Sequence, residues 1–254
     1  MKLPSYVISL HSDPEAIDRL SSQGFDPTLF HAKRHPKGGR IGCFESHFSI
    51  YKAALKRGDP YVAIFEDDVE FLGDINWHVL HETLETHEPD VYLFGARGPS
   101  SVPSNIQGAA HFFGVIQGAH AYVASRAFME HVVRDLEDVD WDWDLFFQPI
   151  RPSFVDVYRR YSKKTMGQYP LVARQGCDHE STISVGNNVR KNNPSACDLD
   201  QNAWYHFGQY ALSVPVLVSV LVLVLVLVTF LVLLCRPRGA HTRAQTMKTD
   251  PSFG

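Results

Sequence analysis

The stretch YVAIFEDD, residues 61–68, decides the fold, because five apolar residues run directly into three carboxylates. A continuous apolar run of this length is typical of a strand that is covered on both faces. In open α/β sheets, ligands bind beyond the carboxyl ends of such strands. The stretch therefore predicts a buried strand that ends at a binding edge marked by Glu66, Asp67 and Asp68.

Strands and helices alternate on both sides of this stretch. The pattern predicts strands at 6–10, 61–65, 90–94 and 119–124, and helices at 14–22, 41–57, 75–87 and 125–136. Asp13 and Ser125 stand where helix N-caps are expected. Residues 95–111, rich in Gly, Pro and Ser, are expected to form a long loop. The alternation indicates an α/β domain with a mostly parallel, Rossmann-like sheet and helices on both sides.

Composition sets limits on the class of protein. The chain has 254 residues and a formal net charge of −4, so no basic face for nucleic acid is expected. Its four cysteines form no C-x-x-C pair and show no zinc spacing with histidine. Scattered cysteines of this kind favour a reducing compartment.

The C-terminal part contains a long apolar run. Residues 212–235 carry no charge and are long enough to cross a bilayer as a helix, which needs about 20 residues. We expect a domain at 1–205, a juxtamembrane link at 206–211 and a basic, disordered tail at 236–254. The positive-inside rule would place that tail in the cytoplasm and the domain outside. With no signal peptide at its start, we instead expect a single-pass, C-terminally anchored membrane protein with a cytosolic domain.

The acidic triplet has two interpretations. Close like charges are costly unless a cation neutralises them, and Mg²⁺ or Mn²⁺ with oxygen ligands would do so while holding phosphates. Glu66 and Asp68 share a face of an extended chain, with Asp67 opposite. The other interpretation is a solvated acidic turn. The position after a buried strand favours the metal.

A second motif precedes the strand. In GRIGCFESH, residues 39–47, glycines open a helix whose free N–H groups attract phosphate. Taken with the acidic triplet, this motif resembles glycosyltransferase family 25, which includes lipopolysaccharide-type and collagen-type sugar transferases. The resemblance extends in order through most of residues 5–185. It rests on the segments 6–10, 39–47, 61–69, 118–125, 140–143 and 170–183.

The resemblance implies a type A glycosyltransferase fold, a nucleotide-sugar donor such as a UDP-sugar, and manganese, with magnesium as the alternative. By analogy Asp68 would contact the metal, and Glu66 or Asp67 the metal or the donor ribose. Ser46 and His47 would line the donor pocket. The sequence departs from the family pattern at residues 9–11 and at Arg40, and these changes affect the expected contacts with the donor's nucleotide base and sugar more than those with the metal.

Transfer with inversion also needs a general base for the acceptor hydroxyl. The stretch DWDWD offers Asp140, Asp142 and Asp144 beside tryptophans that could stack on a sugar. A loop with both tryptophans packed inward explains the pattern equally well. We assign the base to Asp142. His179, between two acidic residues, is a further candidate metal ligand, although a solvated polar turn is the simpler interpretation.

The function predicted from these residues is transfer of a hexose, galactose or glucose, to a glycan or protein hydroxyl, as in lipopolysaccharide or other glycan biosynthesis. A catalytically inactive relative that binds a glycan or acts as a membrane assembly factor is one alternative. A metal-dependent hydrolase of nucleotide sugars is the other.

Overall fold

The computed structural model describes residues 3–36, 38–138, 154–176 and 222–225. The chain divides into two units, Met1–Tyr210 and Ala211–Gly254. In the second unit, residues 222–225 are helical and exposed; the rest of the predicted 212–235 span lies outside the described residues. Among the residues that are described, no helix combines the length and the apolar character that crossing a bilayer requires.

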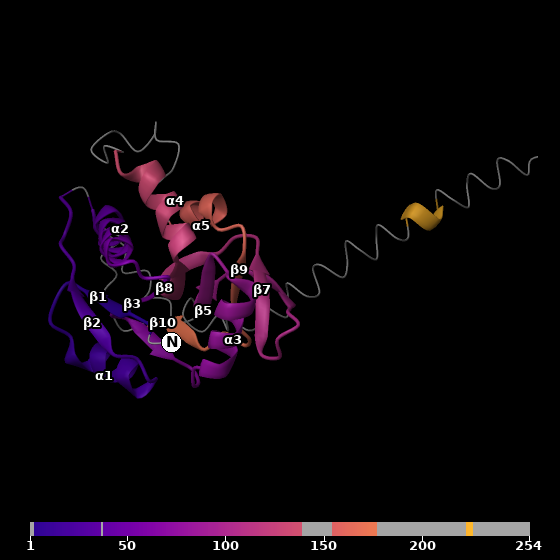
Figure 1. Cartoon of the computed structure of the whole chain (residues 1–254), viewed down its shortest axis with the longest axis horizontal. Coiled ribbons are helices and arrows are strands. Elements are labelled where there is room, and N and C mark those ends of the chain that lie inside the picture. Colours follow the sequence, from indigo (N-terminus) through magenta and orange to yellow (C-terminus); the bar gives the residue numbers. More distant parts are fainter. Residues whose placement is uncertain (1–2, 37, 139–153, 177–221, 226–254) are drawn as a thin grey trace, which may run out of the picture. The chain divides into compact units, whose positions relative to one another are not determined.

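The first unit is built on one large mixed sheet (Figure 1). Its strand order in the described part is β2-β1-β3-β8-β5-β9-β7-β6. The pairings make β1, β2, β3, β5, β6 and β9 run in one direction, with β7 and β8 opposed. The predicted α/β class is confirmed, and antiparallel β8 in the middle makes the sheet mixed. The strands are β1 (Ser5–Ser9), β2 (Pro27–His31), β3 (Tyr61–Glu66), β5 (Val91–Arg97), β6 (Ser100–Pro103), β7 (Ala109–Phe113), β8 (Gln117–Ser125) and β9 (Thr165–Gln168).

A small second sheet extends the binding edge. β4 (Val69–Phe71) pairs antiparallel with β10 (Ala173–Gln175), and Gln175 lies opposite Val69. Because β4 begins directly after the acidic triplet, this pairing brings the late residue Gln175 beside Asp68.

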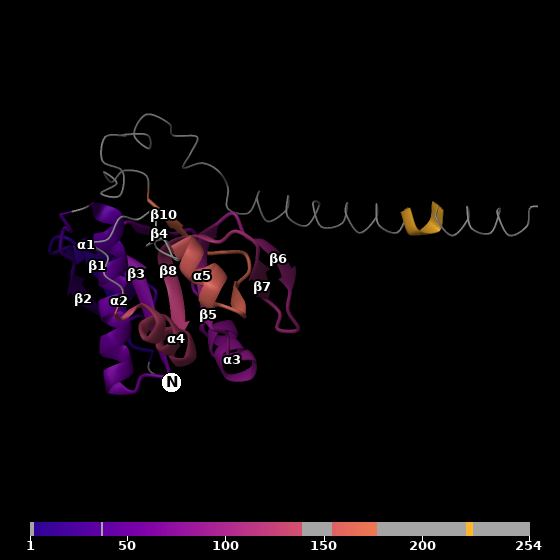
Figure 2. The ribbon, with the colours of Figure 1, turned by 90° about the horizontal axis from the view of Figure 1, so that it is seen from above.

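Helices cover both faces of the large sheet, as predicted, and Figures 1 and 2 show them on its two sides. One core contains residues of α2 (Gly39–Arg57), α4 (Arg126–Leu136) and α5 (Phe154–Tyr161). The other contains residues of α1 (Pro14–Ser22) and α3 (Trp77–His87). The predicted caps are confirmed, since Asp13 accepts from the Ala16 amide at 2.9 Å and Ser125 from the Phe128 amide at 3.2 Å.

The side chains of β3 alternate between the two faces of the sheet, and this alternation determines where the last of them, Glu66, lies. Val62 and Ile64 pack in the core under α2, whereas Ala63 and Phe65 pack in the opposite core. Successive side chains of a strand point to opposite faces, so Glu66 follows Val62 and Ile64 toward α2. The strand thus places a carboxylate against a helix and not in open solvent.

The predicted loop at 95–111 is wrong in part. β6 and most of β7 lie within it and pair antiparallel. Gly108, with φ +87°, turns the chain into β7, where Ala109, Ala110 and Phe112 are buried. Glycine and proline suggested a loop there, and the pairing of β7 with β9 across the sheet overrides that local preference. The sequence analysis also missed the elements β2, β4, α5, β9 and β10.

We predict that Gly95→Ala destabilises the fold, while Gly73→Ala does not. A Cβ on Gly95 would clash with the Ala173 carbonyl oxygen and lie 2.5 Å from Nε2 of His120, whereas at Gly73 the nearest atom would be 3.9 Å away. Overpacking of this kind costs about 1–3 kcal/mol. Urea unfolding of both variants measures the difference, and equal midpoints would contradict the close packing at Gly95.

Candidate functional site

The acidic triplet sits on a backbone that is fixed from three directions. The Asp67 amide donates to the Ile8 carbonyl at 3.0 Å, and Arg19 Nη2 donates to the Asp67 carbonyl at 2.5 Å. The Gly176 amide donates to the Asp68 carbonyl at 2.6 Å. β1, α1 and the end of β10 therefore hold the turn in place before any ligand binds.

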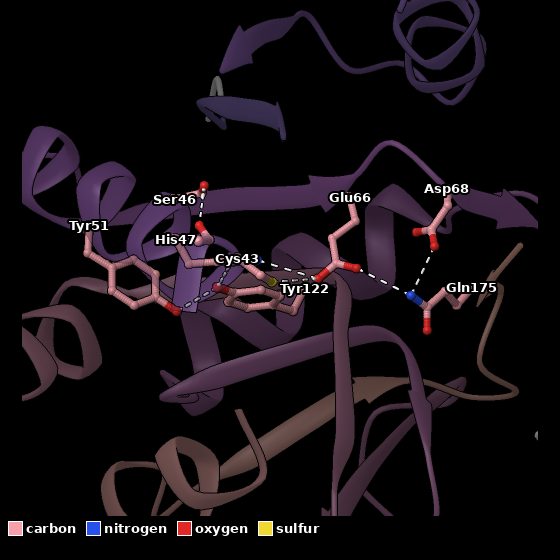
Figure 3. A network of polar contacts seen from close by, with 9 residues as sticks. Cys43, Ser46, His47, Tyr51, Glu66, Asp68, Tyr122 and Gln175 are labelled. Atoms are coloured by element: carbon pink, nitrogen blue, oxygen red, sulfur yellow. Dashed lines mark hydrogen bonds and ion pairs between the residues drawn. The ribbon is translucent and has the colours of Figure 1, made fainter. Parts of the chain in front are cut away.

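Gln175 joins the two outer carboxylates of the triplet (Figure 3). Its Nε2 lies 2.9 Å from Asp68 Oδ2 and 3.5 Å from Glu66 Oε2. Glu66 and Asp68 thus reach one common donor, which agrees with the expectation that they share a face. One amide from a distant part of the chain partly offsets the repulsion between the two charges.

Glu66 also faces the first half of α2. Its Oε1 lies 3.5 Å from Cys43 Sγ and 3.6 Å from His47 Nε2. The His47 side chain is fully buried, and that of Glu66 is 15% exposed. Cys43 and His47 are four residues apart, so they occupy one face of the helix, one turn from each other.

Two tyrosines continue this network into the core. The Tyr122 hydroxyl lies 2.8 Å from Nδ1 of His47 and 2.5 Å from the Tyr51 hydroxyl. One assignment of protons satisfies all three groups: Tyr51 donates to Tyr122, and Tyr122 donates to Nδ1. The imidazole then carries its proton on Nε2, directed at the Glu66 carboxylate.

Among Cys43, His47 and Glu66, burial leaves only the carboxylate charged. Burial raises the pKa of the Cys43 thiol, and the nearby charge of Glu66 raises that pKa further. Burial also lowers the pKa of His47. Burial alone would raise the pKa of Glu66, but the contacts with His47, His120 and Cys43 lower it below its usual value. Near neutral pH the thiol and imidazole are neutral and Glu66 is anionic. The site is therefore prepared for a cation.

Of the carboxylates at the end of β3, Asp68 is the one suited to bind a hard divalent cation. Such cations bind through one or two carboxylates together with substrate phosphates. Both oxygens of Glu66 already lie near donors, on Cys43, His47 and Gln175. Asp68, at the outer end of the network, is the carboxylate that suits the role of ligand, with Glu66 and Gln175 orienting it.

Ser46 and His47, predicted to line one pocket, face different sides of α2. Ser46 Oγ donates to the Gly42 carbonyl at 2.7 Å. Ser46 lines an open pocket of about 430 Å³ on the helix face that turns away from Glu66. Consecutive helical residues point about 100° apart, which separates the two side chains. The pocket is lined by Phe30, His31, Lys33, Gly42, Glu45, Ser46, Phe48, Ser49, Lys52 and Glu137.

Several predicted site residues cannot be placed. Asp140, Asp142, Asp144 and His179 lie outside the described residues.

Conversely, the sequence analysis did not assign Cys43, Tyr122 or Gln175 to the site, although each lies in a segment named there. It also found no metal-type spacing of cysteine and histidine. The structure shows one, because the potential ligand atoms of Cys43, His47 and Glu66 all lie within 4.8 Å of one another.

A pair of tyrosine variants tests the buried network. Tyr122→Phe removes the hydroxyl that joins His47 to Tyr51, and an orphaned buried polar group costs about 1–3 kcal/mol. Tyr92 is the matched control, since its buried hydroxyl has no hydrogen-bond partner among the described residues. We expect Tyr122→Phe to lower the free energy of unfolding in urea and Tyr92→Phe to leave it unchanged or raise it. Equal losses in both variants would contradict the network.

Comparison with known proteins finds a family match over part of the chain. Residues 15–95 match the family model of glycosyltransferase family 25, described as an LPS biosynthesis protein. No curated protein matches the sequence. The crystal structure of A197 from STIV is similar at 12% identity and a TM-score of 0.40, over 74% of this chain and 100% of that one.

A glycosyltransferase involved in the glycosylation of the major capsid of PBCV-1 is similar at 11% identity and a TM-score of 0.40, over 66% of this chain and 82% of that one. At these scores neither structure carries a further argument. The matched segment contains α2, β3 and the acidic triplet, and the motifs beyond residue 95 stay predictions. The similarity to glycosyltransferase family 25 thus covers residues 15–95, about a third of the chain.

Proposed function

We propose that this protein transfers a hexose from a nucleotide-sugar donor to a hydroxyl of a glycan or protein, on a type A glycosyltransferase fold. The observation that carries the proposal is the carboxylate pair Glu66 and Asp68, which shares Gln175 at the carboxyl end of β3. This edge is where α/β sheets bind ligands. The matched family, a group of glycosyltransferases, supports sugar transfer in general.

The reaction breaks the bond between the sugar and the diphosphate, so negative charge develops on the leaving phosphate. A divalent cation, Mn²⁺ or Mg²⁺, would supply charge stabilisation there. Asp68 would hold it, and Gln175 keeps that carboxylate in position. Glu66 is fixed from the side of α2 by His47, so it orients the edge and does not need to move on binding.

Deprotonation of the acceptor hydroxyl is assigned to the stretch 140–144, with Asp142 as the base. A carboxylate in hydrogen-bond reach of the hydroxyl would accept its proton as the new glycosidic bond forms on the opposite face of the sugar. UDP-galactose and UDP-glucose are the proposed donors, and His179 stays a candidate ligand.

We also propose that residues 212–235 anchor the chain in a membrane, with the domain on the cytosolic side. The support is the uncharged apolar length of that segment. Extraction of the chain from membranes by alkaline carbonate would contradict the anchor. Protection of the N-terminal domain from protease in intact vesicles would contradict the orientation.

We predict that Asp68→Asn abolishes metal-dependent transfer. Loss of the ligand charge removes several kcal/mol of stabilisation, equivalent to a fall of about 100-fold or more in kcat/KM. Asp59→Asn, at the other end of β3, is the matched control and should keep near-normal turnover. The assay is nucleotide release by the full chain in detergent, with a panel of nucleotide sugars, with and without Mn²⁺ and acceptors.

The same assay separates the alternatives. Release that acceptors stimulate supports transfer. Release that is indifferent to acceptors indicates a hydrolase, and the absence of donor binding indicates an inactive relative. Either of the last two outcomes contradicts the proposal.

A comparison of the three aspartates tests the assignment of the base. Asp142→Asn should lower turnover by about 100-fold or more with donor binding unchanged, because general base catalysis contributes about 10²–10⁴-fold. Asp140→Asn and Asp144→Asn are the controls and should cost much less. Near-normal turnover of Asp142→Asn would overturn the assignment.

A further inference from the structure

We propose that Cys43, His47 and Glu66 form a binding site for Zn²⁺ or another late transition metal ion, separate from the hard-cation role assigned to Asp68. This proposal does not rest on the proposed function, because it concerns metal binding alone.

The geometry of the three side chains carries the proposal. In a tetrahedral zinc site with Zn–S near 2.3 Å and Zn–N and Zn–O near 2.0–2.1 Å, neighbouring ligand atoms lie about 3.3–3.6 Å apart. Cys43 Sγ and Glu66 Oε1 are 3.5 Å apart, and His47 Nε2 and Glu66 Oε1 are 3.6 Å apart. All three ligand atoms lie within 4.8 Å of one another, so Cys43 and His47 would have to approach each other by at most about 1.3 Å when the ion binds.

The contact between Cys43 and Glu66 is also an ordinary S–H···O hydrogen bond, whereas the contact between His47 and Glu66 fits a hydrogen bond less well. An N–H···O hydrogen bond has a donor–acceptor distance of about 2.7–3.2 Å, so the separation of His47 and Glu66 is too long for a good one. The distance of 3.6 Å between His47 Nε2 and Glu66 Oε1 is close to that between two ligand atoms of one metal ion. A metal ion between them would also neutralise the one buried charge, which the thiol and imidazole do not.

The surroundings supply the support that metal ligands usually have. A histidine ligand normally donates its second ring N–H in a hydrogen bond, and Nδ1 of His47 lies 2.8 Å from the Tyr122 hydroxyl. When the ion binds, the imidazole would carry its proton on Nδ1 in place of Nε2, and the Tyr122 hydroxyl would accept from Nδ1 and donate to Tyr51. The second oxygen of Glu66 lies 3.5 Å from Gln175 Nε2. His47 and Glu66 are thus each positioned by a second contact, to Tyr122 and to Gln175 (Figure 3).

The donor set decides the class of metal. Binding would displace the thiol proton of Cys43 to solvent, because the thiolate is the form that ligates a metal. A thiolate with an imidazole and one carboxylate selects zinc-like ions over Mg²⁺ or Mn²⁺, which prefer oxygen. Three protein ligands leave a fourth tetrahedral position for water or another ligand. Cys43 is only partly buried, so this residue keeps some contact with solvent.

The test uses the full chain, without an affinity tag, in detergent and with Co²⁺ as the probe. We expect a near-ultraviolet thiolate-to-cobalt charge-transfer band that Zn²⁺ abolishes by competition. Cys43→Ser should remove the band. A variant with the other three cysteines changed, Cys177→Ser, Cys197→Ser and Cys235→Ser, should keep it.

Two further variants separate this site from its neighbours. Asp68→Asn should leave the band unchanged, because Asp68 is not one of the three ligands. Tyr122→Phe should keep the band and weaken affinity by about 10–100-fold, as expected for a partner of a ligand. Measured where circular dichroism shows the variant to be fully folded, this loss of affinity distinguishes support of the ligand from a general loss of stability.

Two results would overturn the proposal: no thiolate band in the wild-type chain, or a band that persists in Cys43→Ser. If Cys43→Ser does not fold, X-ray absorption of zinc bound to the wild-type chain gives the answer. The site predicts one sulfur neighbour at about 2.3 Å. A spectrum with nitrogen and oxygen neighbours alone contradicts it.

Discussion

The carboxylate of Glu66, buried against a helix at the end of a strand, is the constraint on which the candidate site depends. A carboxylate in that position is costly unless donors surround it. The chain supplies a thiol and an imidazole from α2, on Cys43 and His47, and an amide from β10, on Gln175. Because these donors come from both ends of the domain, α2, β3 and β10 must dock correctly before the binding edge exists.

The two outer carboxylates, Glu66 and Asp68, differ in position and therefore in proposed role. Glu66 is turned inward by the alternation of β3, and Asp68 lies beyond the strand in the turn before β4. Backbone bonds from β1 and from Gly176 hold that turn. Under the proposed function, a fixed turn would cost less to organise when a diphosphate and its cation bind.

Much of this arrangement follows from the sequence. The apolar run before the triplet predicts β3. Because Glu66 follows Val62 and Ile64 at every second position, it is predicted to lie on the same face of the sheet as these two residues. The periodicity of residues 41–57 places Cys43 and His47 on one helical face. Together these two patterns point to the cluster of Cys43, His47 and Glu66, which a search for linear zinc spacing misses because its third ligand comes from another element.

Other parts depend on contacts that local sequence does not carry. Gln175 reaches the triplet through the pairing of β10 with β4, more than a hundred residues from the start of β3. The hairpin of β6 and β7 forms in a stretch whose composition suggests a loop, because β9 pairs with β7. Ser46 and His47 were predicted to line one pocket, and the helix turns them to different sides.

The central claim is that the nucleotide and its metal bind at Asp68, at the end of β3. Crystals of the protein with UDP and Mn²⁺, measured for anomalous scattering from manganese, test it most directly. The account predicts an anomalous peak at the Asp68 carboxylate, shared with the diphosphate oxygens. A peak away from Asp68, or a nucleotide seated in the pocket lined by Ser46 and Lys52, would contradict it.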